Sequence, residues 1–183
     1  NWGLAREGDL IWEPRFNQLW QQRISDDGKN IAAIVAPQYG KFTVAINGKP
    51  WSKTYSLVND LVISPDGSRA AAVGSENWSH NKYGGDLGEN INKWQIIVDG
   101  LPWQGWYDMV YPPVFSEDGN HVAAKVEKNG KFTIVLDDKT YPEDFKLVWD
   151  PIFSPEGDKL LIRALDKQGQ YVRIIAGIKE FKA

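Results

Sequence analysis

The sequence predicts an all-β protein: a small β-propeller of about four blades with four strands each. A turn signature, Ser-x-acid-Gly, recurs four times and begins at Ser25, Ser64, Ser116 and Ser154, which gives a period near 39 residues with one longer interval. Short apolar runs flank each turn, as is typical of β-hairpins. No segment shows a sustained apolar period of 3.6 residues, so we expect little helix.

The chemistry of the turn signature explains its recurrence. Proline or an acidic residue suits the first central position of a type I turn, and glycine tolerates the positive φ that follows it. We therefore expect positive φ at Gly28, Gly67, Gly119 and Gly157.

Aromatic residues keep a fixed distance from the turns and extend the repeat beyond them. One set lies thirteen residues before each Ser, a second nine before it, and a third nine before the first set. The sets are Trp12, Trp51, Trp103 and Tyr141; Phe16, Tyr55, Tyr107 and Phe145; and Phe42, Trp94 and Phe132, with Tyr171 as counterpart in the last repeat. We expect the tryptophans at these positions to pack between blades.

The repeat predicts a single domain over residues 1–183. Its units are about 13–51, 52–103 with an inserted loop at 75–93, 104–141, and 142–183 completed by 1–12. Pairing of the N- and C-terminal strands would close the ring and remove its open edges. The alternative is a fragment of a larger propeller, or a half that pairs with another copy.

Composition excludes several functional classes. The net charge is −3 without a basic block, so nucleic acid is not expected as a partner. The chain has no cysteine and only two histidines, so we expect neither metal nor cofactor. No apolar run is long enough to span a bilayer. A Gly-x-Ser-x-Gly elbow is absent, and we expect no enzymatic activity.

Candidate partner-binding residues follow from the same register. Large or polar residues lie five positions before each Ser, at the start of the strand that leads into the turn. Closure of the ring would bring these to one rim, where aromatic residues edged by polar groups are typical of an interface. The alternative is that they only plug the channel. The candidates are Trp20, Asn59, Tyr111 and Trp149, the adjacent Asp60 and Asp150, and two tryptophans outside the repeat, Trp78 and Trp106.

The turn signature together with the strand at residues 96–100 resembles the WD40-like repeats of TolB-type propellers. Residues 1–3, 12–16 and 47–51 further resemble the tryptophan-rich D subunit of the Tmc redox complex. That resemblance implies a cofactor-free, non-catalytic scaffold beside cytochrome and iron–sulfur subunits of a membrane-associated electron-transfer complex. It implies a cytoplasmic location peripheral to the inner membrane, with the periplasm as the alternative. A stand-alone TolB-like ligand- or protein-binding propeller is the other reading of the function.

Overall fold

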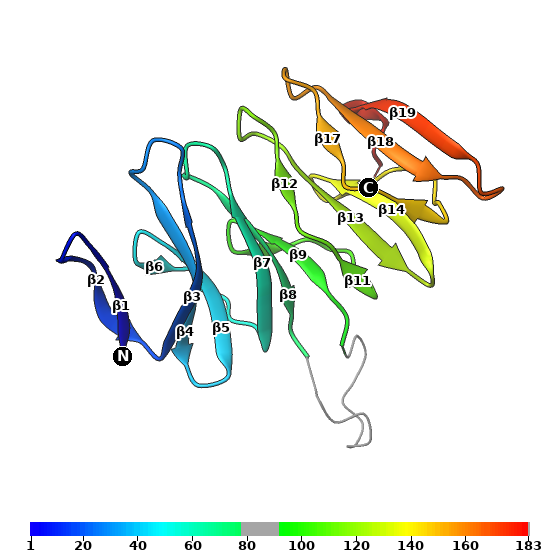
Figure 1. The fold of residues 1–183 in the computed structure, drawn as a ribbon. Coiled ribbons are helices and arrows are strands. Elements are labelled where there is room, and N and C mark those ends of the chain that lie inside the picture. Colours follow the sequence, from blue (N-terminus) through cyan, green and yellow to red (C-terminus); the bar gives the residue numbers. More distant parts are fainter. Residues whose placement is uncertain (78–91, 183) are drawn as a thin grey trace, which may run out of the picture.

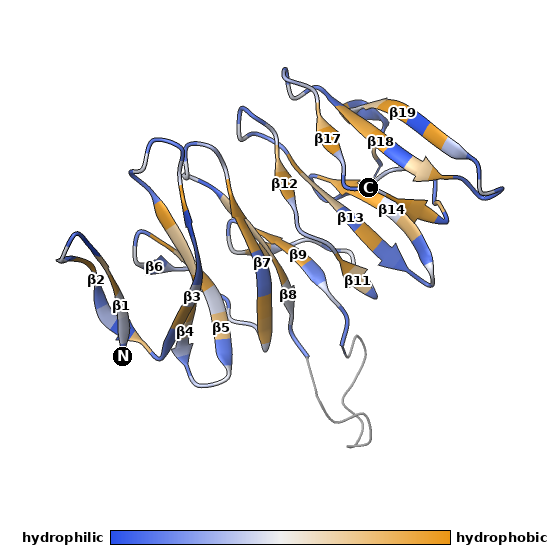
Figure 2. Ribbon diagram, viewed as in Figure 1, coloured by the Kyte–Doolittle hydropathy of each residue, from blue (hydrophilic) through white to orange (hydrophobic). Residues whose placement is uncertain are grey.

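The computed structural model describes residues 1–77 and 92–182. Antiparallel sheets stand side by side in chain order, and the N- and C-terminal elements lie at opposite ends of the row (Figure 1). Apolar residues line the strands and polar residues gather at the turns (Figure 2). The predicted all-β propeller repeat is confirmed. The described residues contain no helix that is long and apolar enough to cross a membrane.

The N-terminal hairpin forms a two-stranded sheet of its own, the hairpin sheet, from β1 (Trp2–Arg6) and β2 (Asp9–Phe16). The first sheet follows, with β3 (Gln18–Ile24), β4 (Ile31–Gln38), β5 (Lys41–Ile46) and β6 (Lys49–Pro50). The second sheet contains β7 (Leu57–Ile63), β8 (Ala70–Ser75), β9 (Gln95–Val98) and β10 (Leu101–Pro102).

The third and fourth sheets repeat this order with an interrupted first strand. The third contains β11 (Met109–Val110), β12 (Val114–Phe115), β13 (Val122–Lys128), β14 (Lys131–Leu136) and β15 (Lys139–Thr140). The fourth contains β16 (Leu147–Val148), β17 (Ile152–Phe153), β18 (Lys159–Leu165) and β19 (Tyr171–Gly177), followed by a 3-10 helix, η1 (Ile178–Glu180). Prolines 112, 113 and 151 fall in the interruptions, because proline has no N–H to donate to the ladder.

The turn signatures connect the first and second strand of each sheet. The four predicted glycines have φ between 69° and 74°, which confirms the expectation. The serine hydroxyl is the centre of each turn. In the third sheet the Ser116 hydroxyl donates to Asp118 and accepts from the backbone N–H of His121. The hydrogen bond from the Ser116 hydroxyl, followed by those from the backbone and side-chain N–H groups of Asn120, lowers the pKa of Asp118 to about 2.

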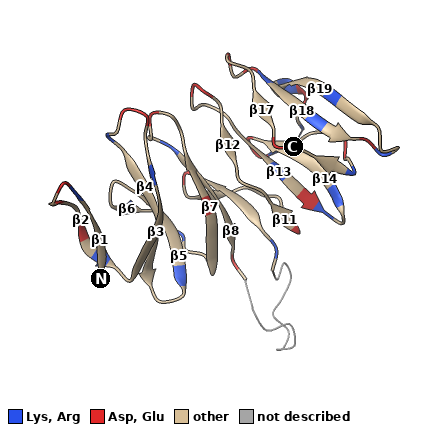
Figure 3. Cartoon of the chain, viewed as in Figure 1, with Lys and Arg blue, Asp and Glu red and all other residues tan. Residues whose placement is uncertain are grey.

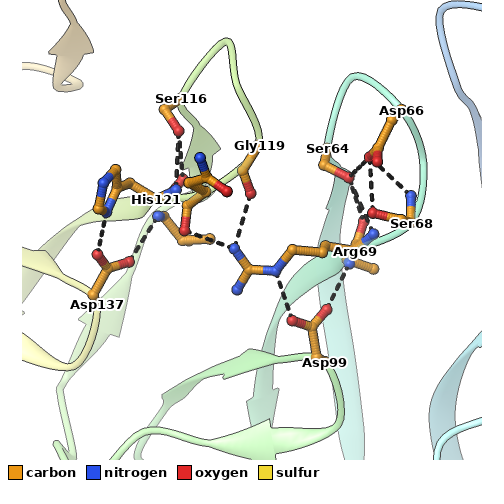
Figure 4. A network of polar contacts seen from close by, with 12 residues as sticks. Ser64, Asp66, Ser68, Arg69, Asp99, Ser116, Gly119, His121 and Asp137 are labelled. Carbon is orange, nitrogen blue, oxygen red and sulfur yellow. Dashed lines mark hydrogen bonds and ion pairs between the residues drawn. The ribbon is translucent and has the colours of Figure 1, made fainter. Parts of the chain in front are cut away.

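Neighbouring turns pack on one another, and Figure 4 shows the contact between the second and third sheets. The guanidinium of Arg69 donates to Asp99 in its own sheet, at 2.8 Å, and to the carbonyls of Gly119 and Asn120 in the next turn, at 2.9 and 2.8 Å. Asn30 makes the equivalent contact one sheet earlier, where its side-chain amide donates to the Asp66 carbonyl at 2.7 Å. The turns of the second and third sheets are therefore each held by the residue that follows the preceding turn.

The core lies between the sheets. One cluster joins the hairpin sheet to the first sheet through Trp12 and Phe16, and three more join the successive sheets. Trp12, Trp94 and Trp103 are buried and Trp51 is half-buried, each within one of these clusters. The prediction that the repeated tryptophans pack between blades is confirmed.

The predicted closure of the ring is not confirmed. The N-terminal residues were expected to complete the last blade, but β1 pairs with β2 and the hairpin sheet packs on the first sheet. The fourth sheet ends at β19, and Lys182 then pairs with Thr140 of the third sheet. The reason is local pairing: closure needed residues near 10–12 as the last strand of the fourth sheet, beyond β19, but β2 pairs with β1 across a short turn instead.

The turn-to-turn packing predicts unequal effects of one substitution at two glycines. A Cβ atom on Gly67 would lie 2.7 Å from the Ser25 Cβ, whereas one on Gly28 would meet nothing within 4 Å. Both substitutions to alanine strain a positive φ, at a cost of about 1 kcal/mol. We expect Gly67→Ala to lower the free energy of unfolding by about 1–3 kcal/mol more than Gly28→Ala, because it adds overlap between turns. Urea unfolding measures the difference, and equal losses would contradict the packing.

Candidate functional site

The aromatic residues predicted to share a rim occupy equivalent places in separate sheets. Each packs against the aromatic residue at the first or second position of the third strand of its own sheet. The ring centroids are 5.5 Å apart for Trp20 and Phe42, 6.4 Å for Tyr111 and Phe132, and 5.7 Å for Trp149 and Tyr171. The structure thus gives each of these residues a partner within its sheet.

The remaining predicted residues lie in different surroundings. Asn59 and Asp60 are half-buried in β7, and burial raises the pKa of Asp60. Trp106 is half-buried in the segment between β10 and β11. Trp78 lies outside the described residues, as does most of the predicted loop at 75–93.

Lys125 links two of the predicted residues across a sheet boundary. Its Nζ lies 3.9 Å from the ring centroid of Tyr111 and 3.0 Å from the Asp150 carboxylate, which belongs to the next sheet. The Lys125 side chain is only 14% exposed. The sequence analysis missed this residue, although a basic residue nine positions after the turn serine, where Ile34 and Val73 stand in other repeats, was a usable signal.

The outward side of the fourth sheet carries large apolar side chains. We call this the open face and define it by Trp149, Ile152, Arg163, Tyr171, Arg173 and Ile175. The register pairs Ile152 with Leu161, Arg163 with Arg173, and Leu161 with Ile175, so these residues share one side of the sheet. Trp149 packs on Tyr171 from the same side.

Exposure distinguishes the open face from the equivalent side of the third sheet. Ile175 is 71% exposed, whereas Leu136, its counterpart in the register of β14, is 2% exposed. Leu136 packs in a cluster with Leu160 and Ile162 of the fourth sheet. In the described part of the chain no further sheet covers the open face, which explains the difference.

Arg163 gives the open face an unsatisfied cationic group. Its Nε is buried and has no hydrogen-bond partner among the described residues, and its Nη2 makes only a long contact of 3.4 Å with the Asp150 carbonyl. Arg163 occupies the position of Lys125, whose partner is a carboxylate of the following sheet. By analogy with Lys125, the Arg163 guanidinium is placed to bind a carboxylate on a protein surface that packs against the open face.

The charged residues within strands β18 and β19 are of one sign, whereas the acidic residues of the fourth sheet lie in its turns and connecting segments. Strands β18 and β19 carry Lys159, Arg163 and Arg173 and no acidic residue (Figure 3). The arrangement can bind a surface that offers both apolar contacts and carboxylates. In the described residues no group of three or more His, Asp or Glu side chains is placed to hold a metal ion.

No protein family and no curated protein matches the chain. Solved structures with a similar fold include TolB from Acinetobacter baumannii, with 12% identity, a TM-score of 0.48, and coverage of 94% of this chain and 44% of that one. Another is the β-propeller domain of the Trilobed protease from Pyrococcus furiosus, with 17% identity, a TM-score of 0.49, and coverage of 87% and 53%. An acylaminoacyl peptidase shows 14% identity, a TM-score of 0.46, and coverage of 94% and 35%. The chain thus spans about half the length of these structures or less, and the likeness concerns the fold alone.

Two expectations from the sequence need correction at this point. The prediction that the chain has no enzymatic activity is wrong as an inference from the fold and sequence, because propellers of similar fold occur in a peptidase and a protease. Identities this low do not show an activity for this chain either. The narrower resemblance to the Tmc D subunit gains no support from the similar structures, which are TolB-type and other propellers.

The different surroundings of Trp20 and Trp149 predict different effects on folding. Trp20 is half-buried between the first and second sheets, whereas Trp149 is 39% exposed on the open face. We expect Trp20→Ala to lower the free energy of unfolding by about 3 kcal/mol, the usual cost of removing a packed indole, and Trp149→Ala by about half as much. Thermal or urea unfolding of the two variants measures this. An equal or larger loss for Trp149→Ala would show that its ring is a core element.

Proposed function

We propose that the protein is a protein-binding propeller module and that its open face docks a partner protein with an apolar surface edged by carboxylates. The observation that carries the proposal is the 71% exposure of Ile175 at a position where the third sheet buries its counterpart. Isolated exposed apolar residues are ordinary, but a contiguous group with Trp149 and Tyr171 is typical of an interaction site. The buried Nε of Arg163 supports the acidic character of the partner.

We further propose that the partners are cytochrome and iron–sulfur subunits of a membrane-associated redox complex, with this chain on the cytoplasmic side. Support comes from the resemblance of residues 1–3, 12–16 and 47–51 to a tryptophan-rich subunit of such a complex. Identification of the proteins that co-purify with the native chain tests this finer proposal. Companions without haem or iron–sulfur centres would overturn it and leave the binding module in place.

Binding should depend on the open face. We expect Trp149→Ala to weaken the complex with the identified partner by at least about 2 kcal/mol, about 30-fold in Kd, because truncation of a central aromatic anchor removes most of its contact. Ile175→Asp should weaken it further, because it places a negative charge against carboxylates. Titration calorimetry with the purified partner measures both effects.

Tyr39→Ala is the matched control, because Tyr39 is 93% exposed on another part of the surface. The affinity of the Tyr39→Ala variant for the partner should equal that of the unchanged chain. Equal affinities for all four proteins would refute the open face as the docking site.

A further inference from the structure

A cleft opens between the third and fourth sheets, on the side where a hairpin turn joins the second strand of each sheet to its third. The cavity of about 250 Å³ is lined by Gly130, Lys131, Asp144, Phe145, Lys146 and Lys167. Gly130 and Lys131 lie at the turn between β13 and β14, and Lys167 lies in the turn between β18 and β19. The other three belong to the segment between β15 and β16. Three separate segments thus each bring one lysine to the cleft.

One carboxylate holds two of these lysines together. The Oδ2 atom of Asp144 lies 3.0 Å from the Nζ atom of Lys131, and its Oδ1 atom lies 2.8 Å from the Nζ atom of Lys167. The hydrogen bond from Lys167, followed by that from Lys131, lowers the pKa of Asp144 to about 2. The carboxylate is therefore ionised at neutral pH, and it keeps an ammonium group of each sheet at the cleft.

Lys146 adds a third ammonium group. A Cβ atom on Gly169 would lie 3.8 Å from the Nζ atom of Lys146, so this group lies beside the turn that also carries Lys167. Among the described residues the exposed Lys146 side chain makes no hydrogen bond or ion pair. Three lysines and one aspartate give the lining a charge of +2. Glu143 lines the adjacent cavity, and the surplus is positive even when it is included.

The equivalent place between the second and third sheets carries the opposite charge. The β-bridges at the two sheet boundaries make Tyr107 the equivalent of Phe145. The residue that follows is Asp108 at one boundary and Lys146 at the other. The Asp108 carboxylate forms an ion pair with Lys93 of the second sheet. The repeat therefore places an acid here at one boundary and a base at the next.

Asp108 also serves the turn of the following sheet. Its Oδ2 atom accepts the backbone N–H of Asn129 at 2.6 Å, so one carboxylate joins a lysine of one sheet to the turn of the next. Lys131 is the equivalent of Lys93, because each directly precedes the aromatic residue of its β-bridge. Between the third and fourth sheets a bound anion can take the place of this carboxylate, with Lys146 among the cations that face it.

The volume and charge of the cleft select the class of ligand. A cavity of roughly 150 Å³ accommodates a benzene molecule, so a cavity of about 250 Å³ holds a small ring together with one tetrahedral anion. A phosphate monoester carries a charge of about −1.5 to −2 at pH 7, which suits the positive surplus. Lysine binds phosphate as a point charge. Phe145 and the aliphatic stems of the lysines offer apolar contacts to the ring.

We propose that this cleft is a binding site for a small phosphate monoester with a ring-sized organic group. Its phosphate binds the ammonium groups of Lys131, Lys146 and Lys167, and its organic group lies against Phe145. The open face is the outward side of the fourth sheet, whereas the cleft lies between the third and fourth sheets. The site therefore goes beyond the proposed function and does not rest on it.

Nuclear magnetic resonance of the ¹⁵N-labelled chain tests the site with three probes: phenyl phosphate, inorganic phosphate and phenol. Phenyl phosphate should shift the backbone amide signals of residues 130–131, 144–146 and 167–169 to saturation. It should bind at least about threefold more tightly than inorganic phosphate, because its ring buries apolar surface. Phenol should not bind, because it lacks the charge. Equal affinities for the two phosphates, or shifts distributed evenly over the lysines of the chain, would overturn the proposal.

Lys146→Asp should weaken phenyl phosphate binding by at least about tenfold, because it removes a cation and places a carboxylate near the phosphate. Lys146→Gln removes only the charge and should have a smaller effect in the same direction. The matched control is Lys41→Gln. Lys41 is the equivalent of Lys131 at the boundary between the first and second sheets, where Ser56 takes the position of Lys146. This control should bind phenyl phosphate within about twofold of the unchanged chain.

Absence of saturable binding, unchanged affinity of Lys146→Asp, or an equal loss in Lys41→Gln would refute the phosphate site. Trp149→Ala should leave phenyl phosphate binding unchanged while it weakens the complex with the partner protein. Failure of the cleft is thus distinguishable from failure of the open face.

Discussion

The order of the sheets depends on the contact of each Ser-x-acid-Gly turn with the turn before it. The glycine leaves room for the preceding serine, and a Cβ on Gly67 or Gly119 would lie 2.7 or 3.1 Å from the Cβ of Ser25 or Ser64. Two residues that follow a turn then donate to a carbonyl of the next turn: Asn30 to Asp66 and Arg69 to Gly119. The serine hydroxyl also makes the hydrogen bonds that fix its own turn. One short signature therefore both shapes the hairpin that contains it and positions the neighbouring hairpin.

A row assembled by such nearest-neighbour contacts has two unlike ends. Every internal sheet is covered on both sides, and the clusters between sheets combine aromatic residues with small and branched aliphatic ones. At one end the fourth sheet exposes Trp149 and Ile175, and at the other the β1 edge leaves Ile24 uncovered. The docking proposal rests on this comparison: the fourth sheet exposes a surface that the third sheet buries.

Much of this architecture was predictable from the sequence. The turn signature, the positive φ of its glycine and the aromatic register gave the sheet order, because these features are local or strictly periodic. Ring closure was not predictable, since it required knowing whether the strand near residues 10–12 pairs beyond β19 in the fourth sheet or locally with residues 2–6. The sequence also did not distinguish the surroundings of the aromatic residues predicted to share a rim. Trp20 and Trp149 are equivalent in sequence, and only the presence of a following sheet makes one half-buried and the other exposed.

Amide hydrogen exchange at Ala5 and Ala45 tests the central claim, that the N-terminal strands pair with each other and do not close the row of sheets. The two residues occupy equivalent positions, and only Ala45 has a second neighbouring strand. The account predicts that the Ala5 amide exchanges close to the rate of an unprotected chain and that the Ala45 amide is protected to the level of the sheet core. Equal protection of the two amides in the isolated chain would contradict it and would favour closure of the row through β1.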